Sequence, residues 1–334
     1  MPADDYLKER RTKDARPVPE KSPSEEYLKV HFEQAAMLGG VDINPKEFFD
    51  QRLRDAKDRI GALLKPDLAS KLRDNVAIGT LENPALNAYI QRRRGTEEHV
   101  ILVNRGFLSV VNHYVKLTHA AIRPADVIYY QGLDPTKLVG ETYLQANQRM
   151  LAAYRRDRIA EGPELKLRTG GAALLSVEFS LHQMHDFVVA HEIGHFVNGD
   201  LANIATLAAM DDGMMRLPPL KHMQEFLADQ FAFAALLRLA ALQVPDAPAV
   251  MILRNSVILF FNLLREISDL GTDSHPPLSL RLLIITDQFF GRKAGTLMRA
   301  SFDDLKKWPE FEAEVERVTV RQLVAKGPGN RVFL

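Results

Sequence analysis

Apolar residues recur at helical spacing along most of this 334-residue chain, and one early stretch instead shows the short apolar runs of strands. Strands are expected at 76–80, 85–90 and 100–104. Helices are expected at 25–64 (two helices), 107–122, 140–158, 172–198, 220–242, 247–270, 277–290, 301–307 and 309–326. The pattern therefore predicts an α+β fold that is mostly α, with one small sheet.

The same pattern suggests how the chain is organised. Residues 1–24 are charged and contain prolines but few apolar side chains, which predicts a flexible N-terminal tail. Residues 25–75 are expected to form a helical extension, whose second helix begins at Asn44-Pro45 because asparagine caps a helix and proline fits its first turn. Residues 76–334 contain the sheet and the later helices, and we assign them to one domain.

Composition narrows the class of protein. Hydrophobic residues make up 46% of the chain, and 43 Lys and Arg balance 43 Asp and Glu, which is typical of an ordinary globular protein. The short basic runs at 91–94 and 155–158 are too small to indicate nucleic-acid binding. No apolar stretch reaches the roughly 20 residues needed to cross a bilayer, and the first residues lack the apolar core of a secretory signal. We therefore expect a soluble, cytoplasmic protein, with its oligomeric state left open.

One pentapeptide carries the clearest chemistry. His191-Glu192-Ile193-Gly194-His195 follows an apolar run at 187–190. On a helix the two histidines lie one turn apart on the same face, where both imidazoles can reach one metal ion. Glu192 projects from a neighbouring face, where it can take a proton from a metal-bound water. The alternative is a surface helix with two solvated histidines, since a short motif can arise by chance.

A later helix offers the third ligand that a catalytic zinc site needs. Glu225 and Asp229 share one face of the helix predicted at 220–242, and much of its remaining surface is apolar. A metal would compensate the buried charge of Glu225, and an N–H of His191 would compensate that of Asp229. The alternative is a helix whose acids face water. Because the chain has no cysteine, nitrogen and oxygen must hold any metal, which suits zinc without excluding other first-row ions.

These residues resemble the motifs of gluzincin metallopeptidases, within them the HtpX and CAAX-prenyl-protease type. Three stretches carry the resemblance in matching order and local spacing: residues 190–200, which end in Asn198-Gly199-Asp200, residues 225–229, and Ser274-His275-Pro276-Pro277 followed by Arg281. A weaker element is the pair of predicted strands within 86–108. The resemblance implies a zincin-like metallopeptidase domain built around the His-Glu-x-x-His helix.

The resemblance also implies roles at the metal. His191, His195 and Glu225 would bind one zinc ion, and Glu192 would act first as general base and then as general acid. Asp229 would orient His191 from the side away from the metal.

Further roles concern the substrate. His275 would stabilise the oxyanion with support from Arg281, although the following prolines fit a plain helix start equally well. Asn87, Ala88 and Tyr89 would form an edge strand to which an extended peptide adds.

Two features depart from the family. Its named members are integral membrane proteins, whereas this sequence offers no segment long enough to span a bilayer. The segment from about 109 to 181 is much longer than the connection in those relatives, which predicts a large insertion. A lid, a partner surface and simple packing remain open for it, and His113 within it is expected to be structural.

We therefore predict a soluble zinc-dependent endopeptidase that hydrolyses protein or peptide substrates with Glu192 as general base. One alternative is a zincin-type peptidase of bacterial stress response or phage conflict with a single dedicated protein substrate. The other is a non-catalytic helical regulator stabilised by a structural metal, which would have a closed four-ligand site. His275 close to the metal would favour the HtpX-like interpretation.

Overall fold

A computed structural model describes residues 2–16, 47–129, 140–157, 167–200, 220–267, 275–326 and 333. The described residues are mostly helical, with a small three-stranded mixed sheet, as the sequence predicted. The chain divides into two compact units, and neither is continuous in sequence. The first contains 1–54, 77–89 and 100–182, and the second contains 55–76, 90–99 and 183–334. This division differs from the expected boundary at residue 76.

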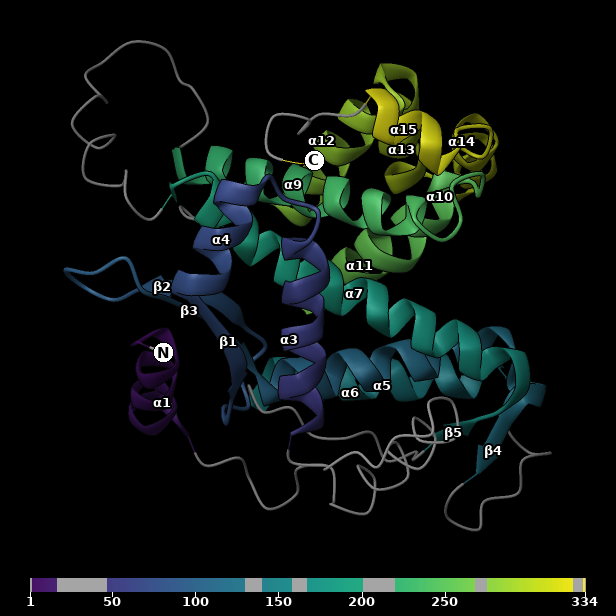
Figure 1. Cartoon of the computed structure of the whole chain (residues 1–334). Coiled ribbons are helices and arrows are strands. Elements are labelled where there is room, and N and C mark those ends of the chain that lie inside the picture. The colour runs from purple at the N-terminus through teal and green to yellow at the C-terminus, as the bar shows by residue number, and fades with distance from the viewer. Residues whose placement is uncertain are drawn as a thin grey trace. The chain divides into compact units, whose positions relative to one another are not determined.

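The first helix of unit 1, α1 (Pro2–Asp14), replaces much of the flexible tail predicted for residues 1–24 (Figure 1). Ala3, Tyr6 and Leu7 have the spacing of one helix face and are buried. They pack against apolar side chains of β1 (Val76–Leu81) and β3 (His99–Asn104). Few apolar residues were therefore enough to dock this helix, because all three lie on one face. Residues 17–24 lie outside the described residues.

The sheet has the strand order β1-β3-β2, with β2 at Ala88–Arg92. All three expected strands are present. Every residue of β1 and β3 is buried, which explains why the sequence of β3 shows no alternation of apolar and polar residues. The described part of the expected extension forms α3 (Phe48–Gly61) and α4 (Pro66–Asn75).

The segment predicted as an insertion builds a small core of its own in unit 1. It contains α5 (Arg105–Ile122), β4 (Val127–Tyr129), α6 (Gly140–Asp157) and β5 (Leu167–Thr169). β4 pairs antiparallel with β5. Apolar side chains from all four elements form one buried cluster: Leu117, Ala120, Val127, Tyr143, Ala146 and Leu167. The segment is thus a packed substructure in its described part.

In its described residues, the regular structure of unit 2 is helical apart from its share of the sheet. Its long helix α7 (Gly171–Val197) starts in unit 1, and Gly199, at a φ of 71°, follows its end as predicted. The helices after it are α9 (Leu220–Ala241), α10 (Ala249–Ile252), a π-helical turn (Leu253–Ile258), α11 (Leu259–Ile267), α12 (Leu278–Phe290), α13 (Arg292–Asp303), α14 (Trp308–Val315) and α15 (Val320–Lys326). The apolar segment within 247–270 is therefore a run of helix in the core, as expected.

Two of the expected helices were wrong in their bounds. The helix expected at 301–307 is α13, which begins at Arg292 directly after Gly291, a glycine with φ of 92°. Polar residues at the start of α13 hid a narrow apolar face that buries Ala294 and Met298. The single helix expected at 309–326 is broken between α14 and α15, because the backbone of residues 318–320 bonds to that of 247–249.

Candidate metal centre

Two helices of unit 2 approach closely enough to share a site because of one glycine. A Cβ atom at position 194 would lie 2.9 Å from Cα of Ala228, so a larger residue would push α7 and α9 apart. Gly194 lies between the two histidines of the motif, and Ala228 lies between Glu225 and Asp229. The contact therefore brings the predicted ligands on the two helices together.

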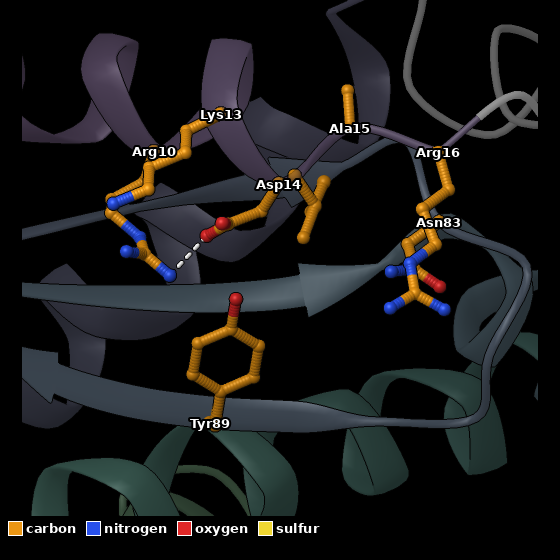
Figure 2. Close-up of a pocket in the computed structure, with 8 residues that line it drawn as sticks. Arg10, Lys13, Asp14, Ala15, Arg16, Asn83 and Tyr89 are labelled. Atoms are coloured by element: carbon orange, nitrogen blue, oxygen red, sulfur yellow. Dashed lines mark ion pairs between the residues drawn. The ribbon is translucent and has the colours of Figure 1, made fainter.

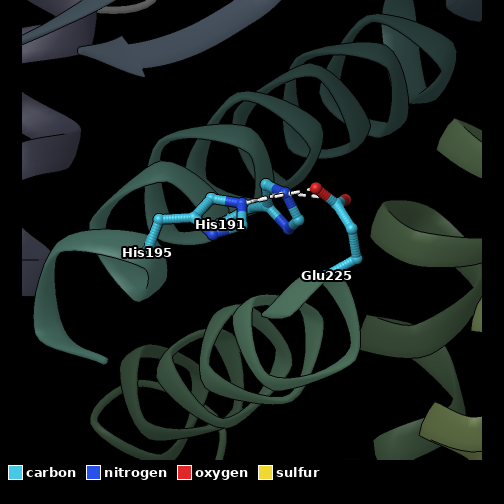
Figure 3. Close-up of side chains that lie close together, drawn as sticks. All are labelled: His191, His195 and Glu225. Carbon is cyan, nitrogen blue, oxygen red and sulfur yellow. Dashed lines mark hydrogen bonds and ion pairs between the residues drawn. The ribbon is translucent and has the colours of Figure 1, made fainter. Parts of the chain in front are cut away.

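Figure 3 shows the imidazoles of His191 and His195 on α7 pointing toward the carboxylate of Glu225 on α9. The two Nε2 atoms are 3.2 Å apart. Oε2 of Glu225 lies 3.5 Å from Nε2 of His191, and Oε1 lies 3.6 Å from Nε2 of His195. Ligand atoms of all three residues lie within 4.8 Å of one another, and this group could hold a metal ion.

A carboxylate orients each histidine from the opposite side of its ring. Nδ1 of His191 lies 2.9 Å from Oδ1 of Asp229, where the sequence placed that acid. Nδ1 of His195 lies 2.9 Å from Oδ2 of Asp200. An Nδ1–H held by a carboxylate leaves the Nε2 lone pair for a metal. Both imidazoles thus turn Nδ1 toward a carboxylate and Nε2 toward the place where a metal ion could bind.

The role of Asp200 was missed by the sequence reasoning, although the residue ends one of the stretches that carry the resemblance. Asp200 is buried, and it directly follows Gly199, whose positive φ turns the chain back toward the end of α7. The signal that could have found it is the requirement that each metal-binding histidine has its own acceptor.

Arg281, on α12, pairs with the two acids of α9. Its Nε and Nη2 donate hydrogen bonds of 2.7 and 2.6 Å to the two oxygens of Asp229. Its Nη1 lies 3.2 Å from Oε2 of Glu225. The guanidinium also stacks over Phe261, with 5.1 Å from Cζ to the ring centroid. Its partners among the described residues are therefore the acids of α9 and a ring of α11.

His275 and Glu192 complete the set of predicted residues near the metal donors. Nε2 of His275 lies 3.6 Å from Oε1 of Glu225, and the side chain is 60% exposed. Glu192 is buried, and its charge contributes to a raised pKa of Arg281. The site thus joins a solvent-exposed imidazole to two half-buried imidazoles and a set of buried acids.

Electrostatics in the cluster depend on its carboxylates. Burial lowers the pKa of His191. The hydrogen bonds of its ring to Asp229 and Glu225, and the negative charges of these acids, outweigh burial and raise that pKa to about 10. Burial opposes ionisation of Glu225 and Asp229, yet the positive charges of His191 and Arg281 lower the pKa of both acids. The cluster therefore stabilises positive charge at the position of His191.

The donor set fits a metal ion. Oε2 of Glu225 is buried, and its neighbours, Nη1 of Arg281 at 3.2 Å and Nε2 of His191 at 3.5 Å, both lack the geometry of a regular hydrogen bond. Two imidazole nitrogens and one carboxylate oxygen are the protein ligands of many catalytic zinc sites. The site also has more acidic than basic side chains, so a bound cation would offset its negative charge. Against the single guanidinium of Arg281 stand four acids: Glu192, Asp200, Glu225 and Asp229.

The predicted peptide-binding residues belong to unit 1, whereas the metal donors belong to unit 2. Asn87 is exposed and precedes β2, and its carbonyl accepts a 2.9 Å hydrogen bond from the N–H of Asn104. Ala88 and Tyr89 are half-buried and begin β2, which is an edge strand among the three described strands. The edge strand is observed, and peptide binding to it stays a prediction.

Comparison with known proteins adds no relative. No family model, no curated protein and no solved structure matches the chain. Among the described residues, no helix is both long enough and apolar enough to cross a membrane. The function is therefore argued from the residues of the site.

Proposed function

We propose that this protein is a zinc-dependent endopeptidase. The observation that carries the proposal is the meeting of His191, His195 and Glu225, whose ligand atoms lie within 4.8 Å of one another. Glu192 stands between the two histidines on the same helix, in the position of a general base. This combination of three ligands and one further acid is typical of hydrolytic zinc sites.

The residues around the ligands have different roles in hydrolysis. A bound zinc ion supplies a Lewis acid for the scissile carbonyl and lowers the pKa of its water. Glu192 takes a proton from the attacking water and later donates it to the leaving amine. His275, exposed and 3.6 Å from Glu225, donates a hydrogen bond to the oxyanion of the tetrahedral intermediate.

The orienting residues favour catalysis over a purely structural metal. Asp229 and Asp200 fix the tautomers of His191 and His195, and Arg281 holds Asp229 through two hydrogen bonds. A structural site is closed by four protein ligands, whereas the part of the chain that the structure describes offers this group three. Glu192 would have no purpose in such a closed site.

Hydrolysis by the zinc-loaded full-length chain tests the proposal. Glu192→Gln should keep its zinc, measured by metal analysis, and lose about 100- to 10,000-fold in the rate of casein cleavage. Glu266→Gln, an exposed change on α11, is the matched control and should retain full activity. A proteome-wide search for new peptide termini extends the test to one dedicated substrate.

Two results would contradict the proposal. One is a zinc-loaded Glu192→Gln protein that cleaves as fast as the original chain. The other is a Glu225→Ala protein whose zinc affinity is unchanged, because loss of a direct ligand should cost more than the roughly 10- to 100-fold typical of an orienting residue. Absence of any Glu192-dependent cleavage across a proteome would favour the regulator instead.

A further inference from the structure

Unit 1 contains a polar pocket that the proposed chemistry does not use. Its volume is about 420 Å³, and it is lined by the C-terminal end of α1 and by the sheet beneath it (Figure 2). Three cationic residues, Arg10, Lys13 and Arg16, line it together with the carboxylate of Asp14 and the phenol of Tyr89. We call this the basic pocket.

Its positive charge is only partly balanced. Arg10 pairs with Asp14, and Nε of Arg10 is buried without a hydrogen bond to any described residue. Among the residues that the structure describes, no ion pair or side-chain hydrogen bond involves Lys13 or Arg16. The basic pocket therefore keeps two positive charges for an anionic ligand.

These cations are not what anchors α1. The neighbouring Arg11 anchors it instead, because its Nη2 pairs with both oxygens of Asp50 and its Nε donates to the carbonyl of Thr80. Ala3, Tyr6 and Leu7 supply the apolar contacts. Lys13 and Arg16 can thus be changed with little effect on folding.

Tyr89 connects the basic pocket to the edge of the sheet. It lies on β2, packs against the apolar cluster beneath α1, and directs its hydroxyl into the pocket (Figure 2). Burial raises the pKa of Tyr89, against the opposing effect of a hydrogen bond from Arg10. The phenol therefore stays protonated and can donate to an anion.

Strand geometry indicates how a ligand would arrive. A peptide that pairs with an edge strand places alternate side chains on each face of the sheet. The residue opposite Tyr89 would have its Cβ about 4.5–5.5 Å from that of Tyr89, on the same face. Its side chain would then lie beside Tyr89, on the face of the sheet that carries the basic pocket.

We propose that the basic pocket binds the carboxylate of an aspartate or glutamate side chain carried by an extended peptide that pairs with β2. Lys13 and Arg16 supply the charge, and Tyr89 supplies a hydrogen bond. As a statement about substrate, this rests on the proposed peptidase function. As a statement about binding, it rests on the basic pocket, whose residues all belong to unit 1.

Peptide binding to the full-length Glu192→Gln protein tests the inference without hydrolysis. Two labelled extended peptides that differ by one Glu-to-Gln change are compared by fluorescence anisotropy. The Glu peptide should bind about three- to tenfold more tightly at low salt, with the ratio shrinking at high salt. Lys13→Gln with Arg16→Gln should bring the ratio to about one. Lys8→Gln, on the exposed side of α1, is the control and should leave it unchanged.

Further measurements test the charge of the basic pocket and the strand pairing separately. Lys13→Glu with Arg16→Glu should favour a peptide with Lys in place of Glu. Equal binding of the Glu and Gln peptides, no binding of either, or a ratio that survives the double variant would overturn the inference. A Glu peptide N-methylated at the residue facing β2 should bind weakly, and undiminished binding would refute strand pairing. Displacement of both the Glu and the Gln peptide by inorganic phosphate would mean that a free anion, not a peptide carboxylate, occupies the basic pocket.

The outcome is independent of the proposed chemistry. Metal-stripped protein should show the same ratio, because no residue of the basic pocket is a metal ligand. A persisting ratio in a protein that never cleaves a peptide would contradict the proposed function alone. Cleavage with no preference for acidic peptides would contradict the inference alone.

Discussion

Two histidines on apolar helices, one in each unit, have opposite electrostatic surroundings. His113 lies on α5 in unit 1 and is 3% exposed. Burial, with the charge of Lys116, lowers its pKa to about 3. His191 lies on α7 in unit 2, where Asp229 and Glu225 outweigh burial and raise its pKa to about 10. At neutral pH the imidazole of His113 is therefore neutral, and that of His191 in the metal-free protein is protonated.

The difference shows which surroundings make a histidine a candidate metal ligand. Burial alone favours a neutral ring, which suits packing. Carboxylates on both sides of His191 stabilise positive charge at that place, whether a proton or a metal ion supplies it. The residues that define the candidate centre are thus the acids of α9 and their partner on α12 as much as the histidines.

The largest expected effect breaks the buried charge network of unit 2. Arg281→Met would leave Asp229 without both of its hydrogen bonds from the guanidinium. Removing one partner of a buried pair typically costs about 3–5 kcal/mol of the free energy of unfolding. Urea denaturation of the metal-free protein measures this loss.

A surface pair supplies the control for Arg281. Arg254 pairs with Glu312 at 3.8 Å, and its side chain is 56% exposed. Arg254→Met should cost about 0–1 kcal/mol. Equal losses from the two substitutions would show that Arg281 does not stabilise the cluster as described.

The pH dependence of stability should separate the two histidines. The folded-state pKa of His191 is raised from 6.5 to about 10, so its stabilisation is complete below pH 6.5 and is lost as pH rises toward 10. The folded-state pKa of His113 is lowered to about 3, so its contribution is lost as pH falls from 6.5 toward 3. Thermal unfolding of metal-free protein across this range should show both losses.

Two comparisons assign these losses to their residues. Zinc-loaded protein should not lose stability between pH 6.5 and 10 through His191, because a metal ligand must be deprotonated. His113→Gln should reduce the loss of stability at acid pH and leave the loss of stability at alkaline pH unchanged. An alkaline loss that persists with zinc bound would argue against His191 as its source.

A smaller effect should follow from changing the carboxylate that orients His195. Asp200→Asn keeps the shape of the side chain but removes the charge that holds Nδ1 of His195 at 2.9 Å. Orienting residues of this kind are worth about 10- to 100-fold in metal affinity. Competition with a zinc chelator gives the ratio, and an unchanged affinity would remove Asp200 from the site.

The smallest expected change concerns the contact between the helices. Gly194→Ala gains about 1 kcal/mol of helix propensity, but its Cβ meets Cα of Ala228 at 2.9 Å. Overpacking of this kind costs about 1–3 kcal/mol, so the net loss should be about 0–2 kcal/mol. Chemical denaturation measures this loss, and zinc affinity should fall with it. A stabilised Gly194→Ala protein would show that the two helices separate freely.

Local patterns in the sequence predicted most elements and the three metal donors. The spacing of His191 and His195 requires only a helix, and Glu225 shares a face with Asp229 for the same reason. The three strands were found from short apolar runs. The helix at residues 2–14 was not expected, since its stability comes from three buried side chains against β1 and β3.

Several other pairings between distant elements were decided by the tertiary structure alone. Residues 229 and 281 meet on different helices, and the basic pocket joins the end of α1 to Tyr89 of the sheet. By itself, the sequence determined which side chains could bind a metal, because ligand type and helical spacing are local properties. Only folding decided which charges surround them, because desolvation and Coulomb interactions depend on distances in space that no local pattern encodes.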